Sequence, residues 1–203
     1  MEIEDRIKHT TLDLFMQYGL KSVSMDDIAR ELGISKKTLY KYFENKEALI
    51  HNIVLDYIEH EQAALTQIKE VSRDAVDEML NIAKHVTRMF RNINPRLVFD
   101  LQKYYPKSWK AVQELQSKFV FTTIMENILK GVSEGFYRDD FCPNIIAKLY
   151  VGKTFFLVDE KHFPLRKYER RQLVIENIRY HLRGIVNENG YRLLEKYMSE
   201  EEE

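Results

Sequence analysis

The sequence predicts an all-α protein in which a three-helix N-terminal domain precedes a larger helical bundle, and two observations carry this prediction. The first is composition: of the 203 residues, 44% are hydrophobic and 31% charged, with only seven glycines and four prolines to break helices. The second is periodicity, because apolar residues recur at helical spacing in successive segments and no segment alternates as a strand would. The length allows one large domain or two smaller ones, and we expect two.

A helix-turn-helix is the most specific pattern in the chain and occupies residues 24–43. Ser24 can cap the first helix and Ser35 the second, because a serine hydroxyl accepts a free backbone N–H of the first turn. Between them, Gly33 suits the left-handed conformation that ends many helices. The residues that face the core at helical spacing are Ile28, Ala29, Leu32, Leu39 and Phe43. The pattern therefore predicts two short helices joined by a tight turn.

The outer face of the second helix carries residue types that suit DNA. These residues are Lys36, Lys37, Thr38, Tyr40, Lys41 and Tyr42. Lysine can donate to guanine, and threonine can donate, accept or contact a thymine methyl group. Tyrosine hydroxyls and further lysines suit phosphate oxygens. The alternative is the solvated face of an ordinary helical protein, but caps, turn and interleaved lysines and tyrosines together are far more specific than adjacent lysines alone.

A wider pattern runs through roughly the first sixty residues. Its members are Ser24, Ile28, Ala29, Gly33, Ile34, Ser35, Leu39, Tyr40, Tyr42, Phe43, Lys46 and Leu49. The pattern resembles the signature of TetR-type transcriptional regulators. The resemblance implies a helical homodimer, usually a repressor, whose N-terminal domain binds a palindromic or near-palindromic DNA operator. It also implies a C-terminal domain that binds a small-molecule effector and thereby loosens DNA.

The resemblance assigns roles to particular residues. The predicted DNA-binding residues are Ser24, Met25, Ser35, Lys36, Lys37, Thr38, Tyr40, Lys41, Tyr42 and Lys46. Those at positions 36–38 look like base readers. The expected contacts to the DNA backbone come from Tyr40, Tyr42 and Lys46, and from the start of the first helix at Ser24 and Met25. Many members have glycine or another small residue at the position of Lys37, so the operator sequence cannot be taken from a relative.

Charge and cysteine content narrow the possible classes. The formal net charge of −1 provides no global basic field for nucleic acid, so DNA affinity must come from local charge. Between Ser35 and Lys46, four lysines face a single acidic residue, Glu44. The single cysteine, Cys142, excludes an intrachain disulfide framework. No apolar run approaches the roughly 20 residues that span a bilayer, and the acidic N-terminus lacks signal-peptide features, so we expect a cytoplasmic protein.

Two domains are expected, a DNA-binding domain at 1–61 and an effector-binding and dimerisation domain at 62–203. The first helix should cover 3–18 and pack against the helix-turn-helix, because two short helices cannot form a core alone. Asn45 should cap a long helix that connects the two domains.

The helices of the second domain follow from periodicity and from breaking residues. They are expected at about 73–91, between Pro95 and Pro106, from 108 to about 134, from 143 to 158, at about 168–186, and after 190. Ser108 is the expected cap of the long third helix. Gly135 should end that helix, and Gly190 should interrupt the chain before the last one.

Two sites are predicted in the second domain. The effector pocket should be lined by Tyr104, Trp109, Phe121, Met125 and Phe155, since ligand sites are mostly apolar. The alternative for these aromatic residues is ordinary core packing. The dimer interface should use Ile145, Leu149, Phe156, Leu173, Ile178 and Leu182, because residues 145–158 are apolar on more faces than one core needs.

Enzyme and metal functions are disfavoured, and no cofactor is expected. The six histidines show neither HExxH nor a paired cysteine and histidine spacing, and the seven glycines form no nucleotide-binding loop. Two alternatives stay open. One is a DNA-binding dimer without an effector, and the other is a redox role for Cys142.

Overall fold

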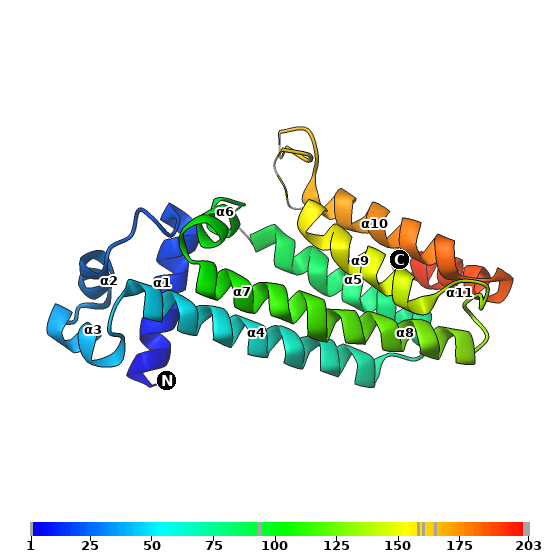
Figure 1. Ribbon diagram of the computed structural model, residues 1–203, viewed down its shortest axis with the longest axis horizontal. Coiled ribbons are helices and arrows are strands. Elements are labelled where there is room, and N and C mark those ends of the chain that lie inside the picture. Colours follow the sequence, from blue (N-terminus) through cyan, green and yellow to red (C-terminus); the bar gives the residue numbers. More distant parts are fainter. Residues whose placement is uncertain (1, 93–94, 158, 160, 165, 201–203) are drawn as a thin grey trace. The chain divides into compact units, whose positions relative to one another are not determined.

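The computed structural model is helical, as the sequence predicts (Figure 1). The structure describes residues 2–92, 95–157, 159, 161–164 and 166–200, and the side chains of 90–92, 95 and 155 are also outside the description. No β-strand forms in these ranges, and an isolated antiparallel bridge joins Tyr137 to Val186. The chain divides into two compact units, Met1–Glu61 with Ile93–Leu115, and Gln62–Asn92 with Gln116–Glu203. The first unit thus contains residues 93–115 in addition to the expected N-terminal domain.

The first unit is built around the N-terminal helices. Its elements are α1 (Ile3–Tyr18), α2 (Met25–Leu32), α3 (Lys36–Tyr42), the first part of α4 (Lys46–Val71), α6 (Pro95–Tyr104) and α7 (Pro106–Glu114). Side chains from all of α1 to α4 meet in one apolar core. The largest fully buried members are Ile7, Phe15, Ile28, Leu39, Leu49 and Ile50. This core explains why α2 and α3, too short to be stable alone, hold their shape.

The second unit is a helical bundle. Its elements are the rest of α4, α5 (Ala75–Asn92), the later part of a π-helical turn (Leu115–Val120), α8 (Phe121–Ser133), α9 (Pro143–Leu157), α10 (Arg170–Ile185) and α11 (Glu188–Glu200). Helix α5 packs against α8, α10 and α11, and α9 packs against α8 and α10. Figure 1 shows α5, α8, α9 and α10 running alongside one another. Apolar side chains from each of them form a single core.

A buried hydrogen-bond network fixes the start of α5 in this bundle. Asp74 caps the helix, because its Oδ1 accepts the backbone N–H of Val76 at 2.9 Å. The Tyr197 hydroxyl of α11 donates to the other oxygen of Asp74 at 2.6 Å. The Tyr137 hydroxyl donates to the carbonyl of Ala75 at 2.9 Å. These bonds satisfy polar groups that burial would otherwise penalise, and they join α5 to α11 and to the loop after α8.

Two expectations about helix ends are wrong, each for a physical reason. Helix α7 begins at Pro106, because proline at the first helical position lacks only an N–H that has no helical partner. Ser108 is therefore not a cap; it is fully buried, with its hydroxyl 3.2 Å from Nδ1 of His51. Gly190 lies inside α11 rather than before it. A Cβ there would lie 2.1 Å from the carbonyl oxygen of Phe136, so close backbone approach explains the glycine.

Candidate functional site

Reciprocal hydrogen bonds fix the start of α2. The backbone N–H of Asp27 donates to the Ser24 hydroxyl at 3.2 Å, and the Ser24 backbone N–H donates to the Asp27 carboxylate at 2.9 Å. This is the complete capping box. The hydrogen bonds from Ser24 hold the pKa of Asp27 below its usual value, so the carboxylate stays charged at the positive end of the helix dipole. At the other end, Gly33 has a φ of 66° in the left-handed region, as predicted.

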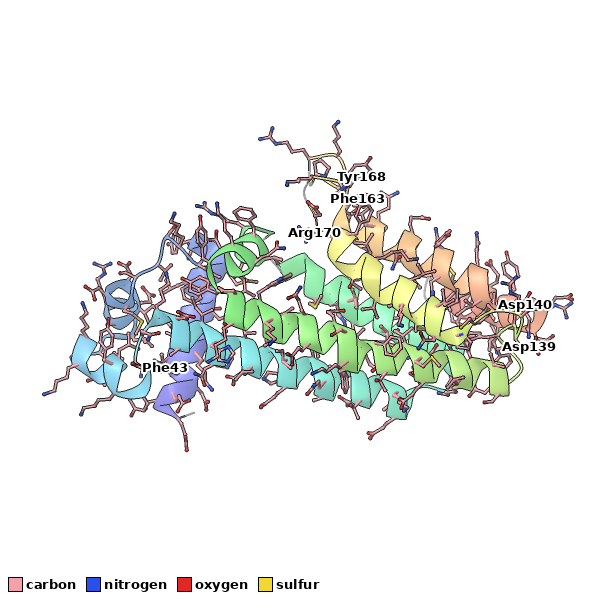
Figure 2. All side chains as sticks on the ribbon, viewed as in Figure 1. Phe43, Asp139, Asp140, Phe163, Tyr168 and Arg170 are labelled. Carbon is pink, nitrogen blue, oxygen red and sulfur yellow. The ribbon has the colours of Figure 1, made fainter. Side chains whose placement is uncertain are left out.

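Helix α3 has one face fixed in the core and the other exposed. The Ser35 hydroxyl accepts the backbone N–H of Thr38 at 3.0 Å, which confirms the second predicted cap. Leu39 is fully buried, and Phe43, directly after the helix, is 3% exposed. Figure 2 labels Phe43. Because these two anchors lie on the same side, the lysines and tyrosines of the helix are exposed, whereas Thr38 is half-buried with its hydroxyl 2.8 Å from that of Ser35.

The exposed face of α3 holds the predicted base readers and their neighbours. Lys36 forms an ion pair with Asp26 of α2, with Nζ and Oδ1 2.7 Å apart, and this contact raises the pKa of Lys36. Lys37 and Lys41 are exposed and have no ion pair in the described part of the chain. Tyr40 and Tyr42 are each 42% exposed. Among the described residues, these two lysines therefore present uncompensated positive charge at this surface.

Two of the predicted DNA-binding side chains are instead partly or wholly internal. Met25 is 7% exposed and belongs to the core of the first unit. The ammonium of Lys46 donates to the carbonyl of Leu20 and lies 5.7 Å from the ring centroid of Phe15. Burial lowers the pKa of Lys46 from its ordinary value. In this structure, Lys46 therefore links the start of α4 to the segment that follows α1, through its hydrogen bond to Leu20.

The residues predicted to form an effector pocket are placed in different parts of the chain. Tyr104 and Trp109 belong to the first unit, whereas Phe121 and Met125 belong to the second. Tyr104 is 40% exposed. The side chain of Phe155 lies outside the described residues. The assignment of these five residues stays a prediction.

The residues predicted to form the dimer interface fall into two groups. On α9, Ile145, Leu149 and Phe156 are 56%, 57% and 46% exposed, so this helix is not buried on all sides within one chain. On α10, Leu173 is half-buried, but Ile178 and Leu182 are 4% and 0% exposed. Ile178 and Leu182 are thus core residues within one chain, and the assignment of the six residues to a dimer interface stays a prediction.

No sequence pattern indicates the cavity that lies between α5, α10 and α11. It has a volume of about 690 Å³, and its lining residues come from α5 and from α10 and α11, which follow each other much later in the chain. A second cavity of about 360 Å³ lies between α1 and α4. Within the described residues, no three histidine, cysteine or acidic side chains are placed to hold a metal ion. No described helix has both the length and the apolar character that crossing a bilayer requires.

Comparison with known proteins agrees with the geometry. Residues 7–53 match the family of bacterial regulatory proteins named for tetR. MftR of Mycobacterium tuberculosis, a transcriptional regulator named for mycofactocin biosynthesis, is 42% identical over 161 residues, covering 72% of this chain and 73% of its own. YvaF, an HTH-type transcriptional regulator of Bacillus subtilis, is 25% identical over 185 residues, 87% of this chain and 91% of its own.

The fold also occurs in solved structures. Reduced NemR of Escherichia coli superposes with a TM-score of 0.74 over 92% of this chain and 98% of its own, at 13% identity. A capped helix-turn-helix on a helical body defines the class: a transcriptional regulator that acts through DNA rather than an enzyme. The chain belongs to the TetR family of bacterial transcriptional regulators.

Proposed function

We propose that the protein is a homodimeric repressor that binds a near-palindromic operator through α3 and leaves it when a small molecule binds the second unit. The observation that carries the proposal is the exposed face of α3. Lys37 and Lys41 have no ion pair there with any described residue, while caps at Ser24 and Ser35 and the anchor at Leu39 hold the helix rigidly. A rigid, cationic, short helix is what the major groove accommodates.

The chemistry of this face separates base reading from positioning. Lys37 and Thr38 lie in the first turn of α3, where side chains of a recognition helix reach base edges. Lys41, Tyr40 and Tyr42 lie further along and suit phosphate oxygens. Since the whole chain has a net charge of −1, these local cations supply the attraction to DNA.

A dimer is required because α3 is only seven residues long. One such helix contacts too few bases for a selective site among genomic competitors. Two copies related by two-fold symmetry would place their recognition helices about 34 Å apart, or a multiple of it, along DNA. The exposed apolar side chains of α9 and α10 support this interface: Ile145, Leu149, Phe156 and Tyr180, of which Tyr180 is 75% exposed. A patch of this kind on a single chain commonly marks an interface.

Effector release is a coupling between two sites. A ligand that prefers the conformation with wrongly spaced recognition helices weakens DNA binding, typically by about 1–3 kcal/mol, and DNA weakens the ligand by the same factor. The support for a ligand is the cavity of about 690 Å³ in the second unit, within the range of small-molecule sites.

Selection of bound DNA from random oligonucleotides tests the proposal. The expected result is an enriched inverted repeat whose half-sites are separated by one or more helical turns. A Lys37→Ala/Lys41→Ala variant should enrich nothing, while Lys161→Ala, an exposed lysine outside α3, should return the same repeat. Absence of enrichment with the unaltered protein, or an enriched single half-site, would contradict the proposal.

A further inference from the structure

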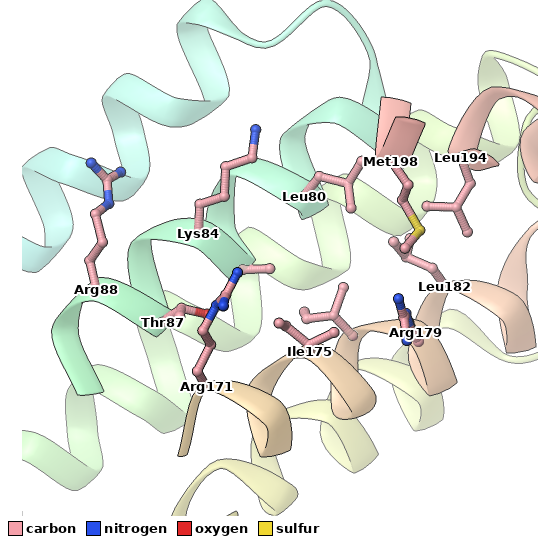
Figure 3. Close-up of a pocket in the computed structure, with 12 residues that line it drawn as sticks. Leu80, Lys84, Thr87, Arg88, Arg171, Ile175, Arg179, Leu182, Leu194 and Met198 are labelled. Carbon is pink, nitrogen blue, oxygen red and sulfur yellow. The ribbon is translucent and has the colours of Figure 1, made fainter. Parts of the chain in front are cut away.

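The cavity between α5, α10 and α11 combines an apolar interior with a basic rim (Figure 3). Its apolar lining consists of Leu80, Ala83, Ile175, Ile178, Leu182, Leu194 and Met198. Leu182, Leu194 and Ile178 are at most 4% exposed, so the floor of the cavity belongs to the close-packed core of the second unit. An apolar body of small-molecule size would lose its hydration on entering, which favours binding.

Every charged residue that lines the cavity within the described chain is basic. These residues are Lys84, Arg88, Arg171 and Arg179, and no acidic side chain is among the lining residues. Arg88 and Arg171 are exposed and form no ion pair within the described ranges. The like charges of these two arginines repel each other, and an anion between them relieves that repulsion.

Arg179 adds an independent observation. Its Nε is buried and has no hydrogen-bond partner in the described structure. Its terminal nitrogen contacts Glu176 at 3.3 Å, on the exposed side of α10. A buried donor without a partner is costly, so a ligand oxygen that accepts from Nε would gain more than one bound to a hydrated arginine. Figure 3 shows Arg179 beside the lining residues Leu182 and Met198.

We infer that this cavity binds an amphipathic anion, with an apolar chain over the leucine and isoleucine floor and a carboxylate or phosphate head at the arginines. Arginine suits both heads, because its planar group donates two parallel hydrogen bonds to either. A neutral molecule of the same shape would leave the repulsion of the rim unrelieved. A cation would increase the repulsion among the positive charges of the rim.

The site stays accessible in the proposed dimer. On α10, the cavity residues 171, 175, 178 and 182 follow the spacing of one helix face. Leu173 and Tyr180 of the proposed interface lie on the opposite side of the same helix. The inference rests on the proposed function only in identifying this ligand as the effector; binding itself needs neither DNA nor a dimer.

Calorimetric titration of the full chain without DNA tests the binding. The probes are dodecanoate, dodecyl phosphate, dodecanol and dodecyltrimethylammonium, each below its aggregation threshold. Saturable one-to-one binding of dodecanoate, dodecyl phosphate or both is expected, and the tighter of the two identifies the head group. Both other probes should bind at least tenfold more weakly. Equal binding of dodecanol, or no binding of either anion, would overturn the inference.

Matched variants locate the site. Arg171→Gln and Arg88→Gln should each weaken the anion about tenfold or more, because each removes a charge-assisted hydrogen bond. Arg183→Gln is the control: it lies on the same helix, pairs with Glu195 at 3.4 Å, and does not line the cavity. The affinity of Arg183→Gln for the anion should stay within about twofold of that of the unaltered protein. Equal losses in the cavity and control variants would place the anion elsewhere.

A further experiment with operator DNA distinguishes this inference from the proposed function. Adding the tighter-binding anion should release the selected operator from the unaltered protein but not from Arg171→Gln. Anion binding without release would leave the site standing and contradict its role as effector. Failure to find an operator would refute the proposed function and leave the calorimetric result untouched.

Discussion

His181 should make the protein less stable as the pH falls below 6.5. The imidazole is 5% exposed in the core between α9 and α10, and its Nε2 is buried without a hydrogen-bond partner. The ring of Tyr150 lies 4.7 Å away, centroid to centroid, and offers no charge to stabilise a cation. Burial lowers the pKa of His181 from 6.5 to about 4, and the positive charge of Lys153 acts in the same direction.

The size of the effect follows from linkage. Well above pH 6.5 the histidine is neutral in both states, so it contributes no pH dependence to the free energy of unfolding there. Between 6.5 and about 4 the unfolded chain binds a proton that the folded chain does not, and stability falls with pH. The expected loss is about 2 kcal/mol between pH 7 and pH 5, and about 3 kcal/mol below pH 4.

Denaturant unfolding at pH 7 and pH 5 measures this loss, with His181→Leu as the test variant. The leucine fills a similar volume and does not titrate, so the pH dependence should shrink by about 2 kcal/mol. His51, whose pKa burial also lowers, accounts for part of the dependence that remains. His60→Gln, at an exposed position, is the control and should behave like the unaltered protein. Equal pH dependence in His181→Leu and the unaltered protein would refute the reasoning.

Three further changes have defined outcomes. Ser24→Ala removes the capping box and should cost about 0.5–2 kcal/mol in denaturant unfolding, with Ser133→Ala, outside any cap, as the unchanged control. Gly190→Ala should lower the free energy of unfolding by about 1–3 kcal/mol, because the alanine Cβ would clash with the carbonyl oxygen of Phe136. Unchanged stability would refute the close approach of the two backbone segments. Leu149→Glu/Tyr180→Glu should give a folded monomer by light scattering that no longer binds operator, and a persistent dimer would place the interface elsewhere.

Local patterns predicted α1 to the start of α4 well because the signals there are local. The caps at Ser24, Ser35 and Asn45 and the turn at Gly33 depend on residues within four positions of one another. Helix α1 spans Ile3–Tyr18, as its periodicity predicts. A helix-turn-helix is therefore readable from a single sequence, and so is the family that uses it.

The chain after α4 shows what sequence patterns leave out. Ser108 looked like a cap because serine caps many helices, but its hydroxyl contacts His51, 57 positions earlier. The helix expected from 108 contains a π-helical turn at Leu115–Val120, which apolar spacing does not reveal. No local pattern predicts the basic rim, because Arg88 and Arg171 are 83 positions apart and line the same cavity only once α5 packs on α10. Such sites depend on tertiary packing, which periodicity cannot encode.

The most direct measurement of DNA recognition by α3 is a binding profile of Lys37→Ala across a library of single-base variants of the selected operator. Lys37 is predicted to read bases, so its loss should remove discrimination of about 1–3 kcal/mol at one or two base pairs in each half-site. Tyr42→Phe, predicted to lose only a phosphate contact, should weaken every variant by a similar factor and keep the profile. A uniform loss across the library from Lys37→Ala, with the profile unchanged, would contradict base reading by this face of the helix.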